Sequence, residues 1–236
     1  EASLGLVEKY LDRHLADRVF ELAWTHSQVQ LRQINATDSE AQVYGRLAAS
    51  VLYANAALRA NGNILSSNQR GQSSLWGYSI SGDLPIVLVQ IEDPAHIYLV
   101  QQLIQAHTYW RLKGLAVDLV IWNEDHAGYR QLLHDQIMAL ITAGTDAHVT
   151  DRPGGIFIRA SDQISAEDRI LFQAVARIIL LGRRGTLHEQ LSRRGRSEET
   201  LPPLLPIRSK RSESLPIPAQ PRPDLIFANG LGGFTP

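Results

Sequence analysis

The sequence predicts an α/β protein: a helical N-terminal segment, then a three-stranded parallel sheet with helices on both faces, then a proline-rich linker. Three observations lead to this prediction. Apolar residues recur at helical spacing over the first sixty residues, three short apolar runs alternate with helical segments further on, and prolines cluster after residue 196. The 236 residues, 44% of them hydrophobic and 20% charged, are typical of a globular chain with a buried core.

The first 64 residues predict two amphipathic helices. Residues 3–26 carry an apolar stripe at three- and four-residue steps, which lines one helical face. Thr37 and Glu40 have the spacing of a capping box, so a second helix is predicted from there to about residue 60. The Asn-Gly-Asn sequence at 61–63 is expected to end it. Residues 65–83, which lack either periodicity, are expected to form a loop.

Residues 84–195 predict the α/β unit. Apolar runs at 84–91, 117–122 and 155–159 have strand length and do not alternate, which is typical of strands buried on both faces. The segments between and after them have helical periodicity, and alternating strands and helices with short connections indicate a parallel sheet with right-handed crossovers. The helices are expected at 94–113, with Asp93 as N-cap, at 126–143, at 165–182, with Ser165 as N-cap, and at 187–194.

The two ends of the chain suggest a segment of a longer protein. The first residue is Glu1 instead of methionine, and residues 224–236 turn apolar and glycine-rich, as though a new strand and hairpin began there. The proline-rich stretch at 196–223 is expected to be a linker. No apolar stretch is long enough to cross a bilayer, so we expect no direct membrane insertion.

Composition excludes several classes of function. Cysteine is absent, which excludes disulfides, thiolate zinc sites and cysteine nucleophiles. A net charge of −1 gives no electrostatic reason to expect a nucleic acid partner. The eight histidines have no metal-ligand spacing, so no metal site is predicted from them. His107 lies on an otherwise apolar helix face and is expected to be a hydrogen-bonded core residue.

Carboxylates follow the first two predicted strands. Glu92 and Asp93 come after the first, and Glu124 and Asp125 come after the second. Ligands of parallel sheets bind beyond the carboxyl ends of the strands, and carboxylate oxygens there would suit Mg²⁺ with a phosphate. The alternative, which we favour, is that Asp93 and Asp125 are helix N-caps and the glutamates are solvated. No glycine-rich phosphate loop follows the first strand.

Trp76, Tyr78 and Asp83 stand together just before the first strand. The two rings would stack on sugars while Asp83 accepts hydrogen bonds from hydroxyl groups, which makes this loop a candidate carbohydrate-binding site. The alternative is that the aromatic rings plug the end of the core and Asp83 fixes the loop. The two interpretations differ in the solvent exposure they require of Trp76.

Three blocks of sequence carry a more specific resemblance. They are LWGYSISGDLPIV at 75–87, YWRLKGLAVDLV at 109–120 and NGLGGF at 229–234. In this order they resemble the large bacterial cyclic β-1,2-glucan synthases. The resemblance implies a helical linker over residues 1–64 and the start of a β-sandwich at 224–236, within a C-terminal region similar to cellobiose phosphorylases.

The resemblance also implies a biochemical setting. The parent enzyme would build β-1,2-glucan from UDP-glucose with a divalent cation, and a phosphorylase-like region using inorganic phosphate would trim the glucan. The segment would lie on the cytoplasmic side of the bacterial inner membrane, as part of a membrane protein. Its partners would be the neighbouring β-sandwich and phosphorylase-like domains. The family's catalytic motifs are not present in this sequence, so no catalytic residue and no cofactor of the segment itself is predicted.

Three functions are therefore weighed. The first is a non-catalytic structural module between domains, and the second is a glucan-binding module that uses Trp76, Tyr78 and Asp83. The third, an enzyme site at the strand-end carboxylates, is the one we favour least, because no acid/base pair or nucleophile set can be assembled around it.

Overall fold

The computed structural model describes residues 2–124, 130–144 and 149–192, together with residues 226 and 234. Contacts divide the chain into two units, residues 1–197 and residues 198–236. In the second unit, Ile226 and Phe234 pair as an antiparallel bridge. The predicted linker at 196–223 and the rest of the predicted hairpin at 224–236 lie outside the described residues.

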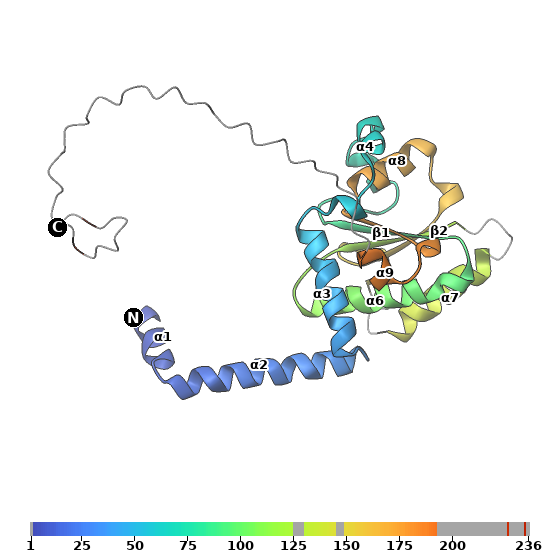
Figure 1. The fold of residues 1–236 in the computed structure, drawn as a ribbon. Helices are drawn as coiled ribbons and strands as arrows, with labels where there is room; N and C mark the ends of the chain where they lie inside the picture. Colours follow the sequence, from blue (N-terminus) through green and yellow to red (C-terminus); the bar gives the residue numbers. More distant parts are fainter. Residues whose placement is uncertain (1, 125–129, 145–148, 193–225, 227–233, 235–236) are drawn as a thin grey trace, which may run out of the picture. The chain divides into compact units, whose positions relative to one another are not determined.

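The first unit contains a parallel sheet of four strands in the order β3-β2-β1-β4 (Figure 1). All pairings are parallel, which confirms the predicted α/β class, but the predicted number of three strands is wrong. Leu88 of β1 lies at the centre of the sheet, paired with Val120 on one side and Ile179 on the other. The strands are β1 (Ile86–Ile91), β2 (Asp118–Asn123), β3 (Ile156–Ala160) and β4 (Ile178–Leu181).

The missed strand, β4, lies in a segment predicted to be helical to residue 182. Helix α8 (Ala166–Val175) ends earlier, and the backbone N–H of Arg177 donates to the carbonyl of Ile86 at 2.8 Å. Ile178 and Ile179 fit the helical stripe begun by Leu171, so periodicity alone favoured one long helix. Without β4, however, the backbone groups along one side of β1 would be buried without partners, and buried backbone polar groups are nearly always paired.

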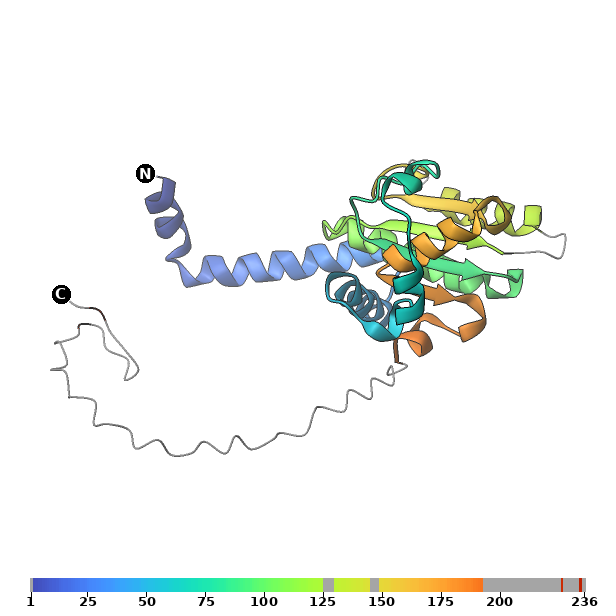
Figure 2. The same ribbon diagram turned by 90° about the horizontal axis from the view of Figure 1, so that it is seen from above.

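Helices cover both faces of the sheet (Figures 1 and 2). Val87, Val89 and Ile91 join one hydrophobic cluster with residues of α3, α6, α7 and α9. Ile86 and Leu88 face the opposite cluster, which includes residues of α8 and the loop before β1. The helices of the first cluster are α3 (Asp38–Leu52), α6 (Ile97–Leu112), α7 (Arg130–Ala143) and α9 (Leu187–Ser192).

The predicted helix over residues 3–26 is two helices, α1 (Ala2–Tyr10) and α2 (Arg13–Gln33). The break occurs because Asp12 has an extended backbone and caps α2, its Oδ1 accepting from the N–H of His14 at 2.9 Å. The predicted capping box of α3 is confirmed: Thr37 Oγ1 accepts from the Glu40 N–H at 3.3 Å, and Glu40 Oε2 accepts from the Thr37 N–H at 2.8 Å.

Helix α3 is shorter than predicted and ends at Leu52, where Tyr53 turns extended. Asn61 does not end a helix but begins one, accepting from the N–H of Ile64 at 3.0 Å as the cap of α4 (Gly62–Ser67). The predicted loop at 65–83 therefore contains the end of α4 and all of α5 (Ser73–Trp76). Asn and Gly occur at both the starts and the ends of helices, so their presence alone does not show whether a helix begins or ends there.

The residues that begin or end the helices of the α/β unit agree better with the predictions. Asp93 accepts from the N–H of Ala95 at 2.8 Å and begins η2 (Pro94–His96), which leads into α6. Gly114, at φ +82°, follows the end of α6, and Ser165 caps α8 by accepting from the Asp168 N–H at 3.1 Å.

A buried carboxylate fixes the turn that leads into β3. Asp118, at the start of β2, is fully buried, and its Oδ1 accepts from the N–H of Gly154 at 2.7 Å. Burial raises the pKa of Asp118, and the Gly154 hydrogen bond opposes that rise. The next residue, Gly155, is also buried, and its carbonyl accepts from the N–H of Leu119 at 2.9 Å. This turn is therefore tied to β2 by both side-chain and backbone bonds.

Candidate functional site

We call residues 76–85 the Trp76 loop; they run from the last residue of α5 to the start of β1. The side chain of Trp76 is exposed, at 63%, and its indole N–H donates to the carbonyl of Ser81 at 3.2 Å. The interpretation of Trp76 as a buried plug of the core is therefore wrong. Its ring is instead held against the loop by one edge while much of its surface meets solvent.

The residues that plug the core are aliphatic. Leu75, only 2% exposed, and Ile80, fully buried, join Phe172 of α8 in the hydrophobic cluster on that face of the sheet. The backbone N–H of Ile80 donates to the carbonyl of Leu75 at 3.2 Å, which closes a tight turn between them. The turn buries Leu75 and leaves its neighbour Trp76 outside.

Tyr78 is partly buried and already bonded. Its hydroxyl donates to Asp168 Oδ2 at 2.9 Å, and its ring meets Phe172 edge-on, with 5.2 Å between ring centroids. Burial, and secondarily the hydrogen bond to Asp168, raise the pKa of Tyr78. This side chain braces the loop against α8, so Trp76 offers more open aromatic surface than Tyr78 does.

Asp83 is exposed, and its Oδ1 accepts from Gln72 Nε2 at 2.9 Å. It lines a cleft of about 480 Å³ together with Arg70 and Arg177. Neither Trp76 nor Tyr78 belongs to the lining of this cleft. The three residues of the candidate carbohydrate site are thus close in sequence, but they do not converge on one described cavity.

The strand-end carboxylates lie along one edge, because β1 and β2 are adjacent and parallel. Asp93 serves as the cap of η2, as the alternative interpretation expects, and Glu92 Oε1 lies 3.6 Å from Arg183 Nη1. The backbone N–H of Glu124 donates to the carbonyl of Ile91 at 2.8 Å. Asp125 lies outside the described residues. Within the described ranges, no three histidine or acidic side chains are placed to hold a metal ion.

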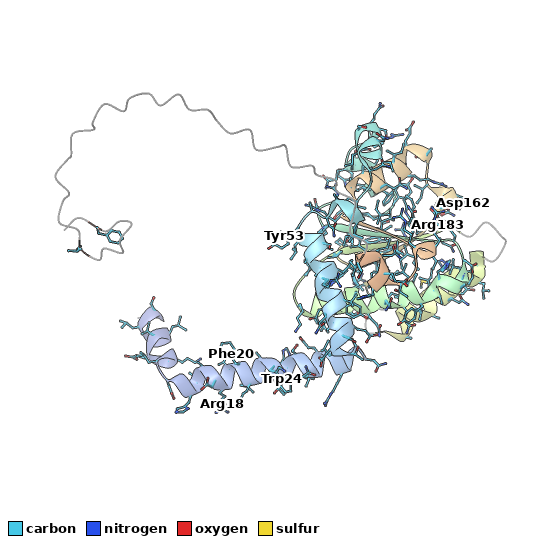
Figure 3. The ribbon with its side chains drawn as sticks, in the orientation of Figure 1. Arg18, Phe20, Trp24, Tyr53, Asp162 and Arg183 are labelled. Atoms are coloured by element: carbon cyan, nitrogen blue, oxygen red, sulfur yellow. The ribbon has the colours of Figure 1, made fainter. Side chains whose placement is uncertain are left out.

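His107 is fully buried, with Nε2 at 3.0 Å from the carbonyl of Val117, which is the core role predicted for it. After the third strand, Ser161 is buried and Asp162 is exposed in η4 (Ser161–Gln163) (Figure 3).

Sequence reasoning missed a second polar cleft because it missed β4. The order β3-β2-β1-β4 means that the chain leaves β1 toward β2 and later returns to the opposite side of β1. Open parallel sheets bind ligands at such a reversal, beyond the carboxyl ends of the two strands. A cleft of about 390 Å³ lies beside the ends of β1 and β4, and it is lined by Arg59, Arg183 and Arg184 among others. We call it the arginine cleft.

No protein-family model matches the chain. The chain is similar to the cyclic β-(1,2)-glucan synthase NdvB of Rhizobium meliloti (strain 1021), with 30% identity over 242 aligned positions. The match takes in 97% of the chain, which spans 8% of that relative's length. Of the helices in the part of the chain that the structure describes, none combines the length and apolar character needed to cross a membrane.

Proposed function

Because this chain is related, along nearly all of its length, to one segment of a cyclic β-(1,2)-glucan synthase, we propose that it is a non-catalytic structural module of a glucan synthase-like polypeptide. In this role it positions neighbouring domains of the same polypeptide. The observation that carries the proposal is the apolar surface of helices α1 and α2.

These helices expose large apolar side chains that belong to neither hydrophobic cluster of the described part of the chain. Phe20 is 74% exposed and Trp24 is 68% exposed (Figure 3). Large apolar side chains grouped on an exposed surface mark sites of protein contact. The others exposed on the two helices are Leu4, Leu6, Val7, Val19, Leu22 and Val29.

The exposed residues of α2 lie on two sides of the helix. Phe20 and Trp24 are four residues apart and share one face. Val19, Leu22 and Val29 recur at three and seven residues and share another. A helix with apolar residues on more than one side is suited to burial between partners, and an ordinary surface helix is not.

The end of α2 is fixed to the α/β unit. Leu31 and Ile34 are buried, and Lys113 Nζ donates to Gln30 Oε1 at 2.9 Å and to Ser27 Oγ at 3.3 Å. A helix that is anchored at one end and exposes apolar faces along the rest supports a role in holding neighbouring domains in fixed positions.

The activity of the whole polypeptide is part of the same proposal. We propose that it makes β-1,2-glucan from UDP-glucose with a divalent cation, and that a phosphorylase-like region trims the product with inorganic phosphate. The module would then lie on the cytoplasmic side of the inner membrane, beside a β-sandwich domain. The name of the relative, a cyclic β-(1,2)-glucan synthase, supports the synthesis of the glucan.

A second candidate function is glucan binding at the Trp76 loop. It is favoured by one observation, the open ring of Trp76, which the Ser81 carbonyl fixes by a hydrogen bond at 3.2 Å. An aromatic ring fixed in this way is a suitable platform for a sugar face. Asp83 lies in the same loop, but its carboxylate is bonded to Gln72.

One titration separates the two functions. We expect linear β-1,2-glucan to give no saturable heat when titrated into residues 1–236 at concentrations up to about 1 mM. A dissociation constant at this limit corresponds to a binding free energy of about −4 kcal/mol. Saturable binding that disappears in Trp76→Ala would establish the second function.

The same protein supplied with glucan and phosphate, or with UDP-glucose, should form no product. Turnover that survives repurification and is lost in Glu124→Ala would contradict the non-catalytic assignment.

A further inference from the structure

The arginine cleft lies on one defined side of the sheet. Gln90 and Leu181, which are register partners at the ends of β1 and β4, form part of its floor. Gln90 shares the side of the sheet faced by Ile86 and Leu88, since alternate residues of a strand point the same way. Gln173 of α8 lines the same cleft, and so does Asn61, the cap of α4.

The turn after β4 brings two of the arginines to this floor. It consists of η5 (Gly182–Arg184) and Gly185, whose φ is +88°. Gly182 approaches His96 so closely that a Cβ at this position would lie 3.1 Å from the His96 Cβ. The lack of a side chain therefore lets Arg183 and Arg184 sit directly beside the end of β1, in the turn that follows the strand.

The third arginine comes from the segment after η1 (Ala56–Leu58). Arg59 Nη2 donates to the carbonyl of Ala174 at 3.2 Å, which ties the side chain to the end of α8. Its Nε is buried and has no hydrogen-bond acceptor among the described residues. The guanidinium is therefore held at a fixed place beside the cleft, and a fixed positive charge attracts anions.

The charge of the cleft is one-sided. Arginines supply all its charged lining residues in the described part of the chain, and Asn61, Gln90 and Gln173 add neutral amide groups. Glu92 Oε1 lies 3.6 Å from Arg183 Nη1, and both of these side chains are exposed. An exposed pair of this kind contributes little and is readily exchanged for a better anion.

We propose that the arginine cleft is a binding site for a small phosphate-bearing anion. Guanidinium groups match phosphate oxygens with paired N–H donors, and three of them suit a ligand with more than one negative charge. A volume of about 390 Å³ falls in the lower part of the range for small-ligand sites, so it admits a phosphate group with a small polar substituent. The amides of Gln90 and Gln173 then face that substituent.

The test is a calorimetric titration of residues 1–236 with inorganic pyrophosphate at constant ionic strength. Saturable binding is expected for the natural sequence. The double variant Arg183→Gln with Arg184→Gln should weaken it at least about tenfold, the effect of losing one charged hydrogen bond. Arg59 is left in place because it also holds α8. Gln173→Glu, which adds a negative charge to the cleft without removing an arginine, should weaken binding by a similar factor.

Arg18→Gln serves as the matched control, because Arg18 is exposed on α2 and does not line the cleft (Figure 3). It should bind pyrophosphate as the natural sequence does. Thermal melts followed by circular dichroism establish that each variant is folded. The proposal is overturned if the natural sequence shows no saturable binding or if the folded cleft variants bind equally well. It is also overturned if succinate, a dianion without phosphate, binds as tightly as pyrophosphate.

Discussion

Replacing Gly155 with alanine is expected to destabilise the α/β unit by more than about 4 kcal/mol, enough to unfold a domain of ordinary stability. A Cβ at this position would lie 1.8 Å from the carbonyl oxygen of Val149 and 2.8 Å from that of Arg152. Both are backbone atoms, so no side chain can rotate away. The turn cannot open freely either, because the carbonyl of Gly155 is bonded to Leu119 of β2.

Urea unfolding followed by circular dichroism measures this effect. The matched control is Gly45→Ala in α3, where a Cβ would meet nothing within 4 Å. That change should stabilise the protein by roughly 0.5 to 1 kcal/mol, because alanine favours helix over glycine. A Gly155→Ala variant that unfolds within about 1 kcal/mol of the natural sequence would show that the turn before β3 is not packed as described.

Leu75→Ala is expected to cost about 2 to 5 kcal/mol, whereas Trp76→Ala at the next position should cost less than about 1 kcal/mol. Leu75 is buried with Ile80 and Phe172, so truncation leaves a cavity in the cluster between the sheet and α8. Trp76 is mostly exposed, and its recorded hydrogen bond is a single one to Ser81. The smaller residue therefore contributes more stability than the larger one.

The two variants are compared by the same urea unfolding measurement. Equal losses, or a larger loss for Trp76→Ala, would mean that the indole ring belongs to the core, as one interpretation of the sequence holds. A small loss for Trp76→Ala leaves a folded protein, so that variant is also suitable for the glucan titration.

The sheet and its caps were largely predictable because they depend on local signals. The runs around Val87 and Val120 are buried on both faces, and the run around Phe157 is buried at its start. A continuous apolar run of strand length has few other uses in an α/β protein. Asp93, Thr37 and Ser165 satisfy free N–H groups at the starts of helices, a task that needs neighbours only two or three residues away.

The fourth strand was not predictable in the same way. Four apolar residues are compatible with either a helix end or a short strand, and only β1, some ninety residues earlier, decides between them. The arginine cleft could not be found without that strand, since Arg59 and Arg183 are distant in sequence and meet only at its end. Whether Trp76 is buried or exposed likewise depends on the turn between Leu75 and Ile80. Helical or strand periodicity does not predict that turn.

The proposed interdomain role requires that α2 docks against other domains of a glucan synthase-like polypeptide. This docking is measured by hydrogen exchange along α2, in residues 1–236 alone and in the full-length polypeptide that contains them. Docking of the faces that carry Phe20 and Trp24 predicts that the amides around them exchange at least about 100-fold more slowly in the full-length protein. The amides of β1 should exchange equally in both and serve as the internal control. Equal exchange along α2 in the two proteins would contradict the role of this chain as an interdomain module.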